Sequence, residues 1–429
     1  MSAVDVPVAL LGYGTVGAAV KRLIDDNGDD IERATGHRLR VVRALVRDPR
    51  RERSTPAERS LFTTDFEQIA RDPEIKLVAE VMGGLEPAAD YVLRLLRAGK
   101  PVVSANKQLI ATRGAELFAV ASEEGLQLRF EASVCAAIPV IKVLREALVV
   151  NNVYRVLGIV NGTTNFVLTR MEGGAGYEDA LGEAQRLGYA EADPSDDLSG
   201  ADAAAKMAIL ATIAFGSRVT LGDVICEGIE DVRREHVSAA QELDMVVRLV
   251  GSASLVDGSV DVRVQPALVD RHHPLAAVEG AFNAVMLQGD AIREITLEGP
   301  GAGGQETASA VVADLVSVVG TSGTGFLQND ACWRTLARLP PGRLCSPFYL
   351  HVEVEDRPGV LARVAERLAT QHVSVARLTQ RQLADGASLD IVTHEATAGQ
   401  AETAVETIGR LDEVHRPPRL MPVITDRPV

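Results

Sequence analysis

Residues 6–24, VPVALLGYGTVGAAVKRLI, join a short apolar run to an amphipathic stretch through the segment Gly12-Tyr13-Gly14-Thr15-Val16-Gly17. A G-x-G-x-x-G spacing between a strand and a helix is the fingerprint of a dinucleotide-binding domain. Its glycines let the turn close and let backbone N–H groups at the helix start approach a pyrophosphate. A glycine turn without a ligand is the alternative, but the flanking strand and helix favour a nucleotide site formed by Gly12, Gly14 and Gly17.

The first third of the chain repeats this alternation of short β-branched runs and helical periods. After VPVALLG come VVRALV, LVAEVMGG, PVVSA and LQLRF, each separated from the next by an amphipathic stretch. Such alternation predicts a parallel sheet wrapped by helices. We therefore expect an α/β fold that opens with a Rossmann-type nucleotide-binding domain over residues 1–132.

The middle of the chain has a different pattern. From about Cys135 to Ala302 strand-like runs are fewer and helical stretches longer, among them CAAIPVIKVLREALVV, EDALGEAQRLG and ADAAAKMAILATIAFG. This pattern predicts a second, α+β domain over residues 133–304. The glycine loop and helical period of GPGAGGQETASAVVADLVSVVG, residues 299–320, predict a helix that packs back on the first domain and completes it with about residues 305–330.

The last part of the chain is set off by a break in the pattern. Paired prolines and a glycine in LARLPPGRLCSP predict a linker over residues 335–347. The tail from Phe348 alternates strand, turn, helix, strand, turn and strand, which is the first half of a split βαβ arrangement. Residues 348–429 therefore form a third predicted domain.

Composition excludes several classes of protein. The 429 residues carry a net charge of -15, which disfavours nucleic acid because phosphate binding needs an excess of cations. No apolar run reaches the about 20 residues that cross a membrane, and the start MSAVDVPVALLG lacks the basic segment of a secretory signal. Four scattered cysteines predict neither a disulfide framework nor a zinc site. We expect a cytoplasmic protein that binds neither nucleic acid nor membrane.

Lysine is rare in this chain, since only six of its 44 basic residues are lysine. Lys107 follows a predicted strand in PVVSANKQLI, at the sheet edge where open parallel sheets place ligands. Lys206 lies one helical turn after Asp202 in ADAAAKMAILATIAFG, so the two side chains share a helix face. A surface ion pair is the alternative for Asp202 and Lys206, and a surface cation for Lys107. The apolar surroundings of the pair favour burial and chemistry.

Two further segments are candidates for substrate binding. Residues 187–200, LGYAEADPSDDLSG, hold four carboxylates within seven residues. A solvated loop or a cation site is possible, but such a cluster also suits a substrate with an ammonium group, and a small amino acid is the substrate class that we favour. Residues 161–166, NGTTNF, end a strand and open a helix, where N–H groups and hydroxyls can hold a polar group. An ordinary N-cap turn is the alternative there.

The residues after the second predicted strand bear on the choice of nicotinamide cofactor. An acidic residue there binds the ribose 2′-hydroxyl of NAD, whereas an arginine accommodates the 2′-phosphate of NADP. This strand runs into Arg47-Asp48-Pro49-Arg50-Arg51. Arg47 predicts a preference for NADP, and Asp48 leaves NAD open. A solvated loop explains Arg50 and Arg51 equally well.

Taken together, these motifs resemble the homoserine dehydrogenase family, in its long bacterial form with a C-terminal ACT domain. The resemblance covers essentially the whole chain, with GYGTVG, SANKQLIATRG, EASVCAAIPVIK, VNGTTNFVL, GYAEADPSDDLSGADAAAKMAILA and GPGAGGQETASAVVADL in the family's order. It implies reversible NAD(P)-dependent interconversion of L-homoserine and L-aspartate 4-semialdehyde, on the route to threonine, isoleucine and methionine. It also implies a catalytic and dimerisation domain over residues 133–304, an ACT domain of βαββαβ topology over residues 348–429, and a homodimer or homotetramer.

The resemblance assigns roles to individual residues. Lys206 resembles the lysine that handles the hydroxyl proton, Asp202 its partner, and Lys107 the lysine near both substrate and nicotinamide. Glu191 resembles the residue that holds the substrate ammonium. The other substrate-pocket positions are matched by Tyr189, Asp197, Gly162 and Thr163, and further cofactor contacts by Thr15, Val16, Ser104, Lys107 and Gly303. Lysine, unlike arginine, can act as a base when its surroundings disfavour its charge, and we expect this of Lys206.

Two other ligands are implied. The family binds a monovalent cation, Na or K, through a segment that corresponds here to Glu131, Val134, Ala136 and Ile138. Family members usually have small glycine-rich residues in this segment, whereas this chain has Cys135-Ala136-Ala137. In the tail, the segment 356–361, DRPGVL, resembles the ACT signature, which makes Asp356, Gly359 and Val360 candidate contacts for an amino-acid effector. The effector implied is threonine, and the alternative is a turn without a ligand in a domain that only dimerises.

Two rival functions remain at this stage. Aspartate-semialdehyde dehydrogenase shares a nucleotide domain but needs a thiolate nucleophile with a histidine, and Cys135 is the one cysteine near the expected position. An amino-acid sensor with an inert nucleotide fold is the second rival. An inert fold would have no use for the glycine motif, the two lysines and the acidic segment together.

Overall fold

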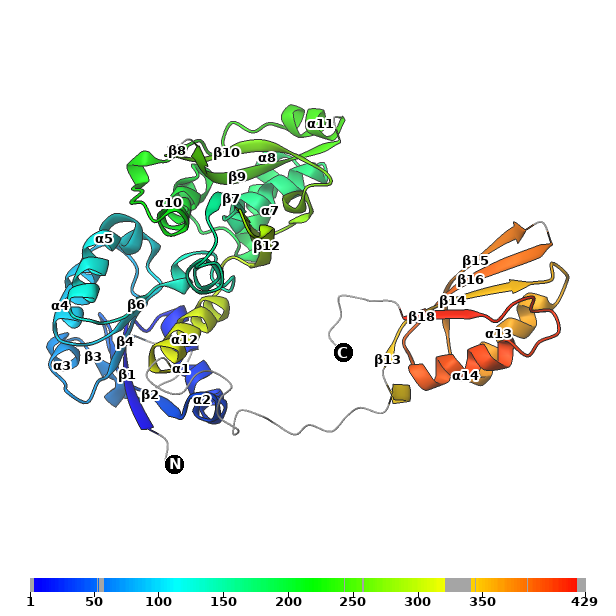
Figure 1. Ribbon diagram of the computed structural model, residues 1–429, viewed down its shortest axis with the longest axis horizontal. Helices are drawn as coiled ribbons and strands as arrows, with labels where there is room; N and C mark the ends of the chain where they lie inside the picture. Colours follow the sequence, from blue (N-terminus) through cyan, green and yellow to red (C-terminus); the bar gives the residue numbers. More distant parts are fainter. Residues whose placement is uncertain are drawn as a thin grey trace. The chain divides into compact units, whose positions relative to one another are not determined.

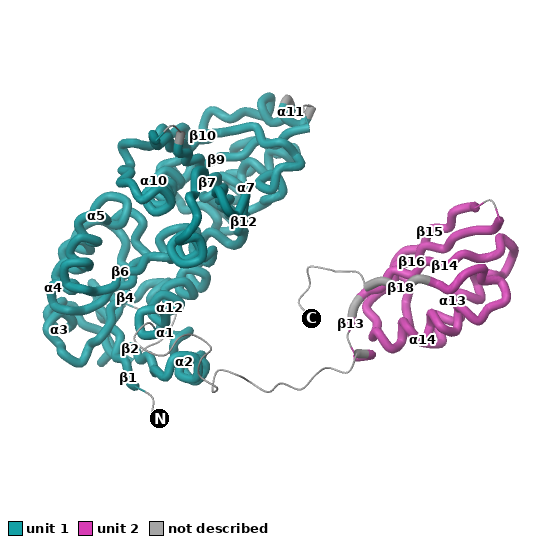
Figure 2. The backbone as a smooth tube through the Cα atoms, viewed as in Figure 1, with its two compact units in different colours: residues 1–333 teal, residues 334–429 magenta. Residues whose placement is uncertain are grey.

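The computed structural model describes residues 4–51, 53, 58–242, 244–256, 258–320, 341–343, 345–383 and 385–422. Its contacts divide the chain into two compact units, residues 1–333 and 334–429 (Figure 2). Much of the predicted linker, residues 335–340 and 344, lies outside the described residues, as do residues 321–330 of the segment expected to complete the first domain. Within the described ranges, no helix is both long enough and apolar enough to cross a membrane.

Unit 1 begins with a parallel sheet in the strand order β3-β2-β1-β4-β5-β6, which confirms the predicted Rossmann-type architecture (Figure 1). The strands are β1 (Val4–Leu11), β2 (His37–Leu45), β3 (Phe62–Thr63), β4 (Leu77–Glu80), β5 (Val102–Ser104) and β6 (Leu128–Arg129). One face carries α3 (Glu67–Ala70), α4 (Ala88–Arg97) and α5 (Lys107–Glu123), and the other carries α1 (Thr15–Asp26), α2 (Gly28–Thr35) and α12 (Gly304–Gly320). A short 3₁₀ turn, η1 (Arg59–Leu61), precedes β3.

Helix α12 returns to the first sheet after an excursion through the rest of unit 1, as its sequence predicted. Its side chains Val311 and Leu315 are fully buried in the same apolar core as Leu10 of β1 and Val103 of β5, and the helix contacts β4 and β5. It also lies along α1 (Figure 1). The N-terminal nucleotide-binding part is therefore built from both ends of unit 1.

The intervening part contains a second sheet of order β12-β11-β7-β9-β10-β8, covered on one face by helices. Its strands are β7 (Val153–Ile159), β8 (Ile225–Cys226), β9 (Met245–Val256), β10 (Ser259–Asp270), β11 (Phe282–Gly289) and β12 (Arg293–Pro300). Its helices are α7 (Gly162–Glu172), α8 (Tyr177–Leu187), α9 (Ser195–Leu198), α10 (Ala201–Phe215) and α11 (Arg234–Glu242), with 3₁₀ turns η4 (Leu221–Asp223) and η5 (Pro274–Ala277).

Two expectations for this part were wrong in detail. We expected few strands, but β9 and β10 are twelve residues each and pair along their whole length. We also expected one long helix in CAAIPVIKVLREALVV. This segment forms only the three-residue α6 (Val140–Lys142) and a π-helical turn, η3 (Val143–Ala147), and the 3₁₀ turn η2 (Glu131–Ser133) precedes it. Cys135 and Ala136 have positive φ values of 53° and 41°, and Pro139 is the N-cap of α6, so the helix cannot begin earlier.

Unit 2 confirms the predicted βαββαβ topology. It contains β14 (Phe348–Val354), α13 (Val360–Thr370), β15 (Val375–Leu383), β16 (Gly386–Thr393), α14 (Ala398–Ile408) and β18 (Arg419–Pro422). The antiparallel sheet has the order β15-β16-β14-β18, and both helices pack on one face of it. A short turn η7 (Pro341–Arg343) and a pair of two-residue strands, β13 (Cys345–Ser346) and β17 (Ala396–Thr397), lie beside this sandwich. Strand β15 is an edge strand, and its side chains are exposed along its length.

Candidate active site

The glycine loop has the backbone geometry that a bound pyrophosphate requires. Gly12 has a φ of 104°, and a Cβ there would lie 2.9 Å from the carbonyl oxygen of Val81. A Cβ at Gly17 would lie 2.4 Å from the carbonyl oxygen of Gly12. At Gly14, by contrast, no atom of a described residue lies within 4 Å of the Cβ position. Gly12 and Gly17 thus close the turn, and Gly14 leaves the start of α1 open to a ligand.

The start of α12 lies next to this loop. A Cβ at Gly304 would lie 2.5 Å from Cγ2 of Thr15, the first residue of α1. The neighbouring Gly303 has a φ of 135°, a conformation that side chains disfavour. Two of the predicted cofactor contacts, Thr15 and Gly303, are therefore close in space although they are far apart in the sequence. Val16, the next residue of α1, packs on the core beneath the loop.

In the loop after β2, Arg47 and Asp48, the two residues that bear on cofactor choice, differ in their hydrogen bonding. The Asp48 carboxylate accepts a hydrogen bond from the Arg50 backbone N–H at 2.8 Å, so it is engaged in a local turn. Arg53 donates to the Asp48 carbonyl oxygen at 2.7 Å and lies over the Phe62 ring, 4.3 Å from its centroid. Arg47 is exposed and forms no hydrogen bond or ion pair with a described residue. Its guanidinium is therefore available to an anionic group.

The three predicted catalytic side chains meet at one carboxylate. Helix α10 packs against α5, and the Asp202 carboxylate on α10 pairs with two ammonium groups. One of its oxygens, Oδ2, lies 2.8 Å from Nζ of Lys206 on the same helix, and the other pairs with Nζ of Lys107, the first residue of α5. Asp202 and Lys206 are buried, whereas the Lys107 side chain is 46% exposed. The nucleotide-binding part and the α10 helix thus each supply one lysine to the same acid.

Asn161 holds this cluster in place, and sequence reasoning missed it. Its side-chain nitrogen donates to Oδ2 of Asp202 at 2.9 Å and to Oδ1 of Asp197 at 2.7 Å. Its side-chain oxygen caps α7 by accepting the Thr164 N–H at 2.9 Å. The preceding residue, Val160, accepts a hydrogen bond from Nζ of Lys206 at 2.7 Å through its carbonyl oxygen. The signal available in the sequence was the segment NGTTNF, which was interpreted through its N–H groups and hydroxyls, or as an N-cap turn, with no role for the Asn161 side chain beside Asp202.

The charges in this cluster are strongly coupled. Burial alone would raise the pKa of Asp202, but the ammonium groups of Lys206 and Lys107 outweigh it and hold that pKa well below its usual range. For Lys206, burial lowers the pKa, but Asp202 outweighs it, so the pKa of Lys206 is raised. We expected the surroundings of Lys206 to disfavour its charge, and this expectation was wrong. A carboxylate 2.8 Å away stabilises the ammonium more than burial destabilises it.

The remaining predicted substrate residues lie around the start of α7. A Cβ at Gly162 would lie 2.6 Å from the carbonyl oxygen of Ala281, so glycine is needed there for packing. Thr163 is buried and donates its hydroxyl to the Tyr189 carbonyl oxygen at 2.6 Å. Tyr189 is 48% exposed. The side chain of Glu191 is also exposed, and it pairs with no described residue. Asp197 joins the Asp202 cluster through Asn161, whereas Glu191 does not.

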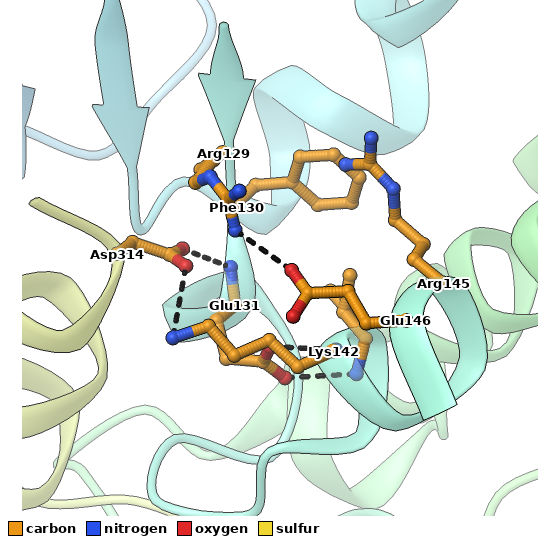
Figure 3. Close-up of a pocket in the computed structure, with 8 residues that line it drawn as sticks. Arg129, Phe130, Glu131, Lys142, Arg145, Glu146 and Asp314 are labelled. Carbon is orange, nitrogen blue, oxygen red and sulfur yellow. Dashed lines mark hydrogen bonds and ion pairs between the residues drawn. The ribbon is translucent and has the colours of Figure 1, made fainter. Parts of the chain in front are cut away.

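Glu131 lies in a buried cluster of charged groups where the two parts of unit 1 meet (Figure 3). Its carboxylate accepts the backbone N–H groups of Ile141 and Lys142, each at 2.8 Å, and its own N–H donates to Asp314 on α12 at 2.9 Å. The Lys142 ammonium lies 3.7 Å from the same Asp314 carboxylate. Burial raises the pKa of Glu131 to about 7 and also raises the pKa of Asp314. The Lys142 ammonium thus pairs with Asp314, whereas Glu131 is bound by backbone N–H groups.

The residues of this cluster agree only in part with the predicted cation ligands, and the hollow is lined by the cations Arg129, Lys142 and Arg145 as well as by three carboxyl groups. The hollow beside Glu131 is lined by Arg129, Phe130, Ile141, Lys142, Arg145, Glu146 and Asp314 as well, but not by Val134, Ala136 or Ile138. These three residues follow Glu131 closely in the sequence, and they are buried. Across the described part of the chain, no group of three or more His, Cys, Asp or Glu side chains could hold a metal ion. A cation near Glu131 would therefore need backbone carbonyl ligands, which hard cations accept.

In unit 2, the predicted effector residues line an open hollow of about 350 Å³. Asp356 and Gly359 belong to the turn between β14 and α13, and Val360 begins the helix. Gly359 is the N-cap of α13 with a φ of 91° and carries no side chain over the free N–H groups of the first turn. Gln380 of β15 completes the hollow and donates to Asp356 at 3.4 Å.

Three protein-family models match successive parts of the chain. The family model described as homoserine dehydrogenase matches residues 139–316, and the model of its NAD binding domain matches residues 12–131. The ACT domain model matches residues 348–413.

Whole-chain relatives agree. The homoserine dehydrogenase of Mycobacterium bovis is 42% identical over 427 residues, covering 95% of each chain, and that of Corynebacterium glutamicum is 40% identical over 410 residues, covering 94% of this chain and 92% of the relative. The crystal structure of a homoserine dehydrogenase from Thiobacillus denitrificans has a TM-score of 0.71 at 37% identity, covering 98% of this chain and 99% of the other. A hyperthermophilic archaeal homoserine dehydrogenase in complex with NADPH has a TM-score of 0.64 at 29% identity, covering 75% of this chain and 99% of the other.

Replacing the shared carboxylate tests the electrostatics of the site through stability. Asp202→Asn leaves the Lys206 ammonium buried without an anion, so we expect the free energy of unfolding to fall by about 3–5 kcal/mol in urea denaturation near neutral pH. The contribution of Asp202 is present above the usual carboxyl pKa of 3.8 and is lost as the pH falls below it, since its folded-state pKa is lowered.

The matched control is Asp25→Asn, which removes the acid of the solvent-exposed pair Lys21–Asp25, also four residues apart. We expect a change below about 1 kcal/mol there, because exposed pairs contribute little. Equal effects of the two substitutions would contradict a strongly coupled buried site.

Proposed function

The chain belongs to the homoserine dehydrogenase family, and we propose that it interconverts L-homoserine and L-aspartate 4-semialdehyde at the cluster around Asp202. The observation that carries this proposal is the Asp202 carboxylate, which joins Lys107 from the nucleotide-binding part to Lys206 of the second part. A dehydrogenase needs a proton-transfer group beside the cofactor site, and lysine can both lose and regain a proton.

The glycine loop, Thr15 and Gly303 fit a dinucleotide, because a pyrophosphate needs the open backbone found at Gly14. When bound, the nicotinamide accepts or supplies the hydride. The protein's own part is to hold the substrate and to move the hydroxyl proton. With its pKa raised, Lys206 is an ammonium near neutral pH, which suits proton donation to the aldehyde oxygen in reduction. The reverse oxidation needs the neutral amine and is therefore favoured by alkaline pH.

Two carboxylates support binding of a substrate ammonium, Asp197 in the Asp202 cluster and Glu191 outside it. Glu191 is exposed and pairs with no described residue, so its charge is available, as the resemblance to the family implies. Asp197 is held by Asn161 beside Asp202. Tyr189, Gly162 and Thr163 shape the same wall, with the Thr163 hydroxyl fixing the Tyr189 backbone. Lys107 opens α5 at the junction with β5, from which its ammonium reaches toward both ligands in this proposal. Ser104, the other predicted cofactor contact at this junction, is fully buried, and its hydroxyl is bonded to Glu80.

The rival functions are not favoured. An acyl-transfer mechanism like that of aspartate-semialdehyde dehydrogenase needs a thiolate, but Cys135 is 1% exposed and burial raises the pKa of its thiol. An inert nucleotide fold would not place two lysines on one buried acid beside a glycine loop.

For the cofactor we propose a preference for NADP over NAD. Arg47 is exposed and has no described partner, whereas the Asp48 carboxylate is already bonded to the Arg50 N–H. We also propose a monovalent cation, Na or K, near Glu131, because this buried carboxyl group forms no ion pair with a described residue, whereas the Lys142 ammonium pairs with Asp314. Val134, Ala136 and Ile138 would contribute backbone oxygens.

We further propose that unit 2 regulates the enzyme by binding threonine between Asp356, Gly359 and Val360. The free N–H groups at the start of α13 suit the carboxylate of an amino acid, and Asp356 suits its ammonium. A homodimer or homotetramer in the cytoplasm is part of the same proposal. Support comes from β15, an exposed edge strand with unpaired backbone groups on its outer side.

Removing the transferable proton tests the role of Lys206. We expect Lys206→Arg and Lys206→Met each to lower kcat for homoserine oxidation by about 10²-fold or more, because neither side chain exchanges a proton near neutral pH. Activity is followed as cofactor reduction by absorbance. The control is Lys100→Met, because Lys100 is also buried but donates only to the backbone oxygens of Asp72 and Ile75. That variant should lose stability and keep kcat, and near-normal turnover of the Lys206 variants would reduce Lys206 to a structural ion pair.

Reversing the charge at position 47 tests cofactor choice. Arg47→Asp should raise the KM for NADP more than the KM for NAD, by about tenfold or more, since a charge-assisted bond to the 2′-phosphate is lost. Steady-state kinetics with both cofactors measure the ratio. Arg51→Asp is the control for a general loss of positive charge in this exposed loop. A proportional effect on both cofactors would mean that Arg47 does not contact the 2′-phosphate.

Deleting residues from Phe348 onward tests regulation. Because no proposed catalytic or cofactor residue lies in unit 2, homoserine oxidation should remain while any response to threonine disappears. Gly359→Val, which places a side chain over the start of α13, should have the same effect in the full chain. Inhibition of the truncated enzyme at an unchanged threonine concentration would place the effector in unit 1.

A further inference from the structure

Glu80 is a buried acid for which the proposed reaction gives no role. It is the last residue of β4, at the edge of the sheet where the cofactor loops begin, and its relative exposure is 0%. Within the described part of the chain, it forms no ion pair. Burial raises the pKa of Glu80, while hydrogen bonds from Ser104, Met82 and Gly83 act in the opposite direction. A charged side chain that is costly to bury and has no cation beside it calls for an explanation.

The two oxygens of Glu80 bind two different loops. Oε1 accepts the backbone N–H of Met82 at 2.8 Å and that of Gly83 at 3.3 Å, both in the loop between β4 and α4. Oε2 accepts the hydroxyl of Ser104 at 2.6 Å, at the end of β5. One carboxylate therefore sets the separation between these loops.

The first of these loops supports the cofactor site. A Cβ at Gly12 would lie 2.9 Å from the carbonyl oxygen of Val81 and 3.2 Å from Cα of Met82. The loop that Glu80 holds is thus in close contact with the first glycine of the dinucleotide motif.

The second loop carries Lys107. The Ser104 hydroxyl oxygen accepts the Asn106 N–H at 3.1 Å, and the Asn106 side chain donates to the Gly84 carbonyl oxygen at 2.6 Å. Asn106 also caps α5 by accepting the Leu109 N–H at 3.1 Å. Lys107 is the next residue, and its ammonium pairs with Asp202. An unbroken series of hydrogen bonds therefore runs from Glu80 to the start of the helix that presents this lysine.

We propose that Glu80 is a positioning residue, whose carboxylate spans the β4–α4 loop and the β5–α5 junction and thereby fixes Lys107 relative to both the glycine loop and Asp202. The proposal rests on the proposed function in so far as Lys107 acts in the reaction. Misplacement of a reacting group by about 1 Å costs up to about 10²-fold in rate, so a small change in this span is measurable.

Two substitutions in the full-length enzyme distinguish the effect of the Glu80 side-chain length on kcat from the effect of its charge. Glu80→Asp keeps the carboxylate but is one methylene too short to reach both loops, so we expect kcat to fall by about 10- to 100-fold. Glu80→Gln keeps the length, and its amide can accept from Met82 while donating to the Ser104 oxygen, so we expect kcat within about threefold of the parent. Glu172→Asp, the same shortening at a partly buried ion pair outside the site, should leave kcat within about twofold.

A double-mutant cycle shows whether Glu80 acts through Lys107. In the Lys107→Ala background, Glu80→Asp should lower kcat by less than about twofold further, because the group that it positions is absent. Full activity of Lys107→Ala alone would count against the proposed function. A Lys107→Ala enzyme with reduced but measurable kcat, in which Glu80→Asp lowers kcat by the same factor as in the parent, would overturn only the positioning role.

The remaining outcomes are also decisive. If Glu80→Gln folds and its kcat falls at least as much as that of Glu80→Asp, the charge of Glu80 matters rather than the distance that its side chain spans. If both variants have near-normal kcat, neither the charge nor the span of Glu80 matters for the reaction. Either result overturns the proposal. If Glu80→Asp does not fold, a Glu80→Gln enzyme with unchanged kcat and an unchanged pH profile still supports it, and a Glu80→Gln enzyme with a displaced pH profile overturns it.

Discussion

The site depends on one buried carboxylate that is shared by two ammonium groups. Asp202 is 6% exposed, so its charge is tolerated only because Lys206 and Lys107 lie against it. Lys206 comes from the same helix, whereas Lys107 opens a helix of the nucleotide-binding sheet. The contact between α5 and α10 is therefore fixed both by apolar packing and by a charge that neither helix could bury alone. This contact is one of those that join the two parts of unit 1 into a compact body.

Two asparagines in the loops near Asp202 hold helix starts and neighbouring groups in fixed positions. Asn161 and Asn106 each cap a helix with their side-chain oxygen and use their side-chain nitrogen to bind a neighbouring group, Asp202 in one case and Gly84 in the other. An asparagine is suited to this because its amide carries both an acceptor and donors. Each cap is thus also a bond between chain segments distant in the sequence, so that helix starts and reacting groups are fixed together.

A feature of the fold or of the site could be predicted from the sequence where neighbouring residues determine it. The GYGTVG turn, the Rossmann-type alternation and the first strand, helix and two strands of the tail follow from short-range patterns, and they were predicted. The complete βαββαβ topology of the tail was implied only by the resemblance to the family. Strands β9 and β10 were missed because Gly251, Ser252 and Pro266 interrupt their apolar alternation. Their partners across the sheet supply the stability that local propensity lacks. The direction of the pKa shift of Lys206 was predicted wrongly. The sequence shows an apolar helix and therefore burial, but whether a facing carboxylate outweighs burial depends on a distance that the sequence does not give. Glu80 and Asn161 act through partners that no local pattern reveals.

The return of α12 to the first sheet has a consequence for how this chain is made. Val8, Leu10 and Val103 lie on the face that Val311 and Leu315 of α12 finally cover. At a synthesis rate of about 5–20 residues per second, the ribosome needs roughly ten to forty seconds to proceed from the end of the sheet to the end of that helix. During this interval part of an apolar sheet face lies open to other nascent chains. Early protection by a chaperone that recognises apolar surface would therefore matter more for this protein than for one whose Rossmann-type domain is contiguous in sequence.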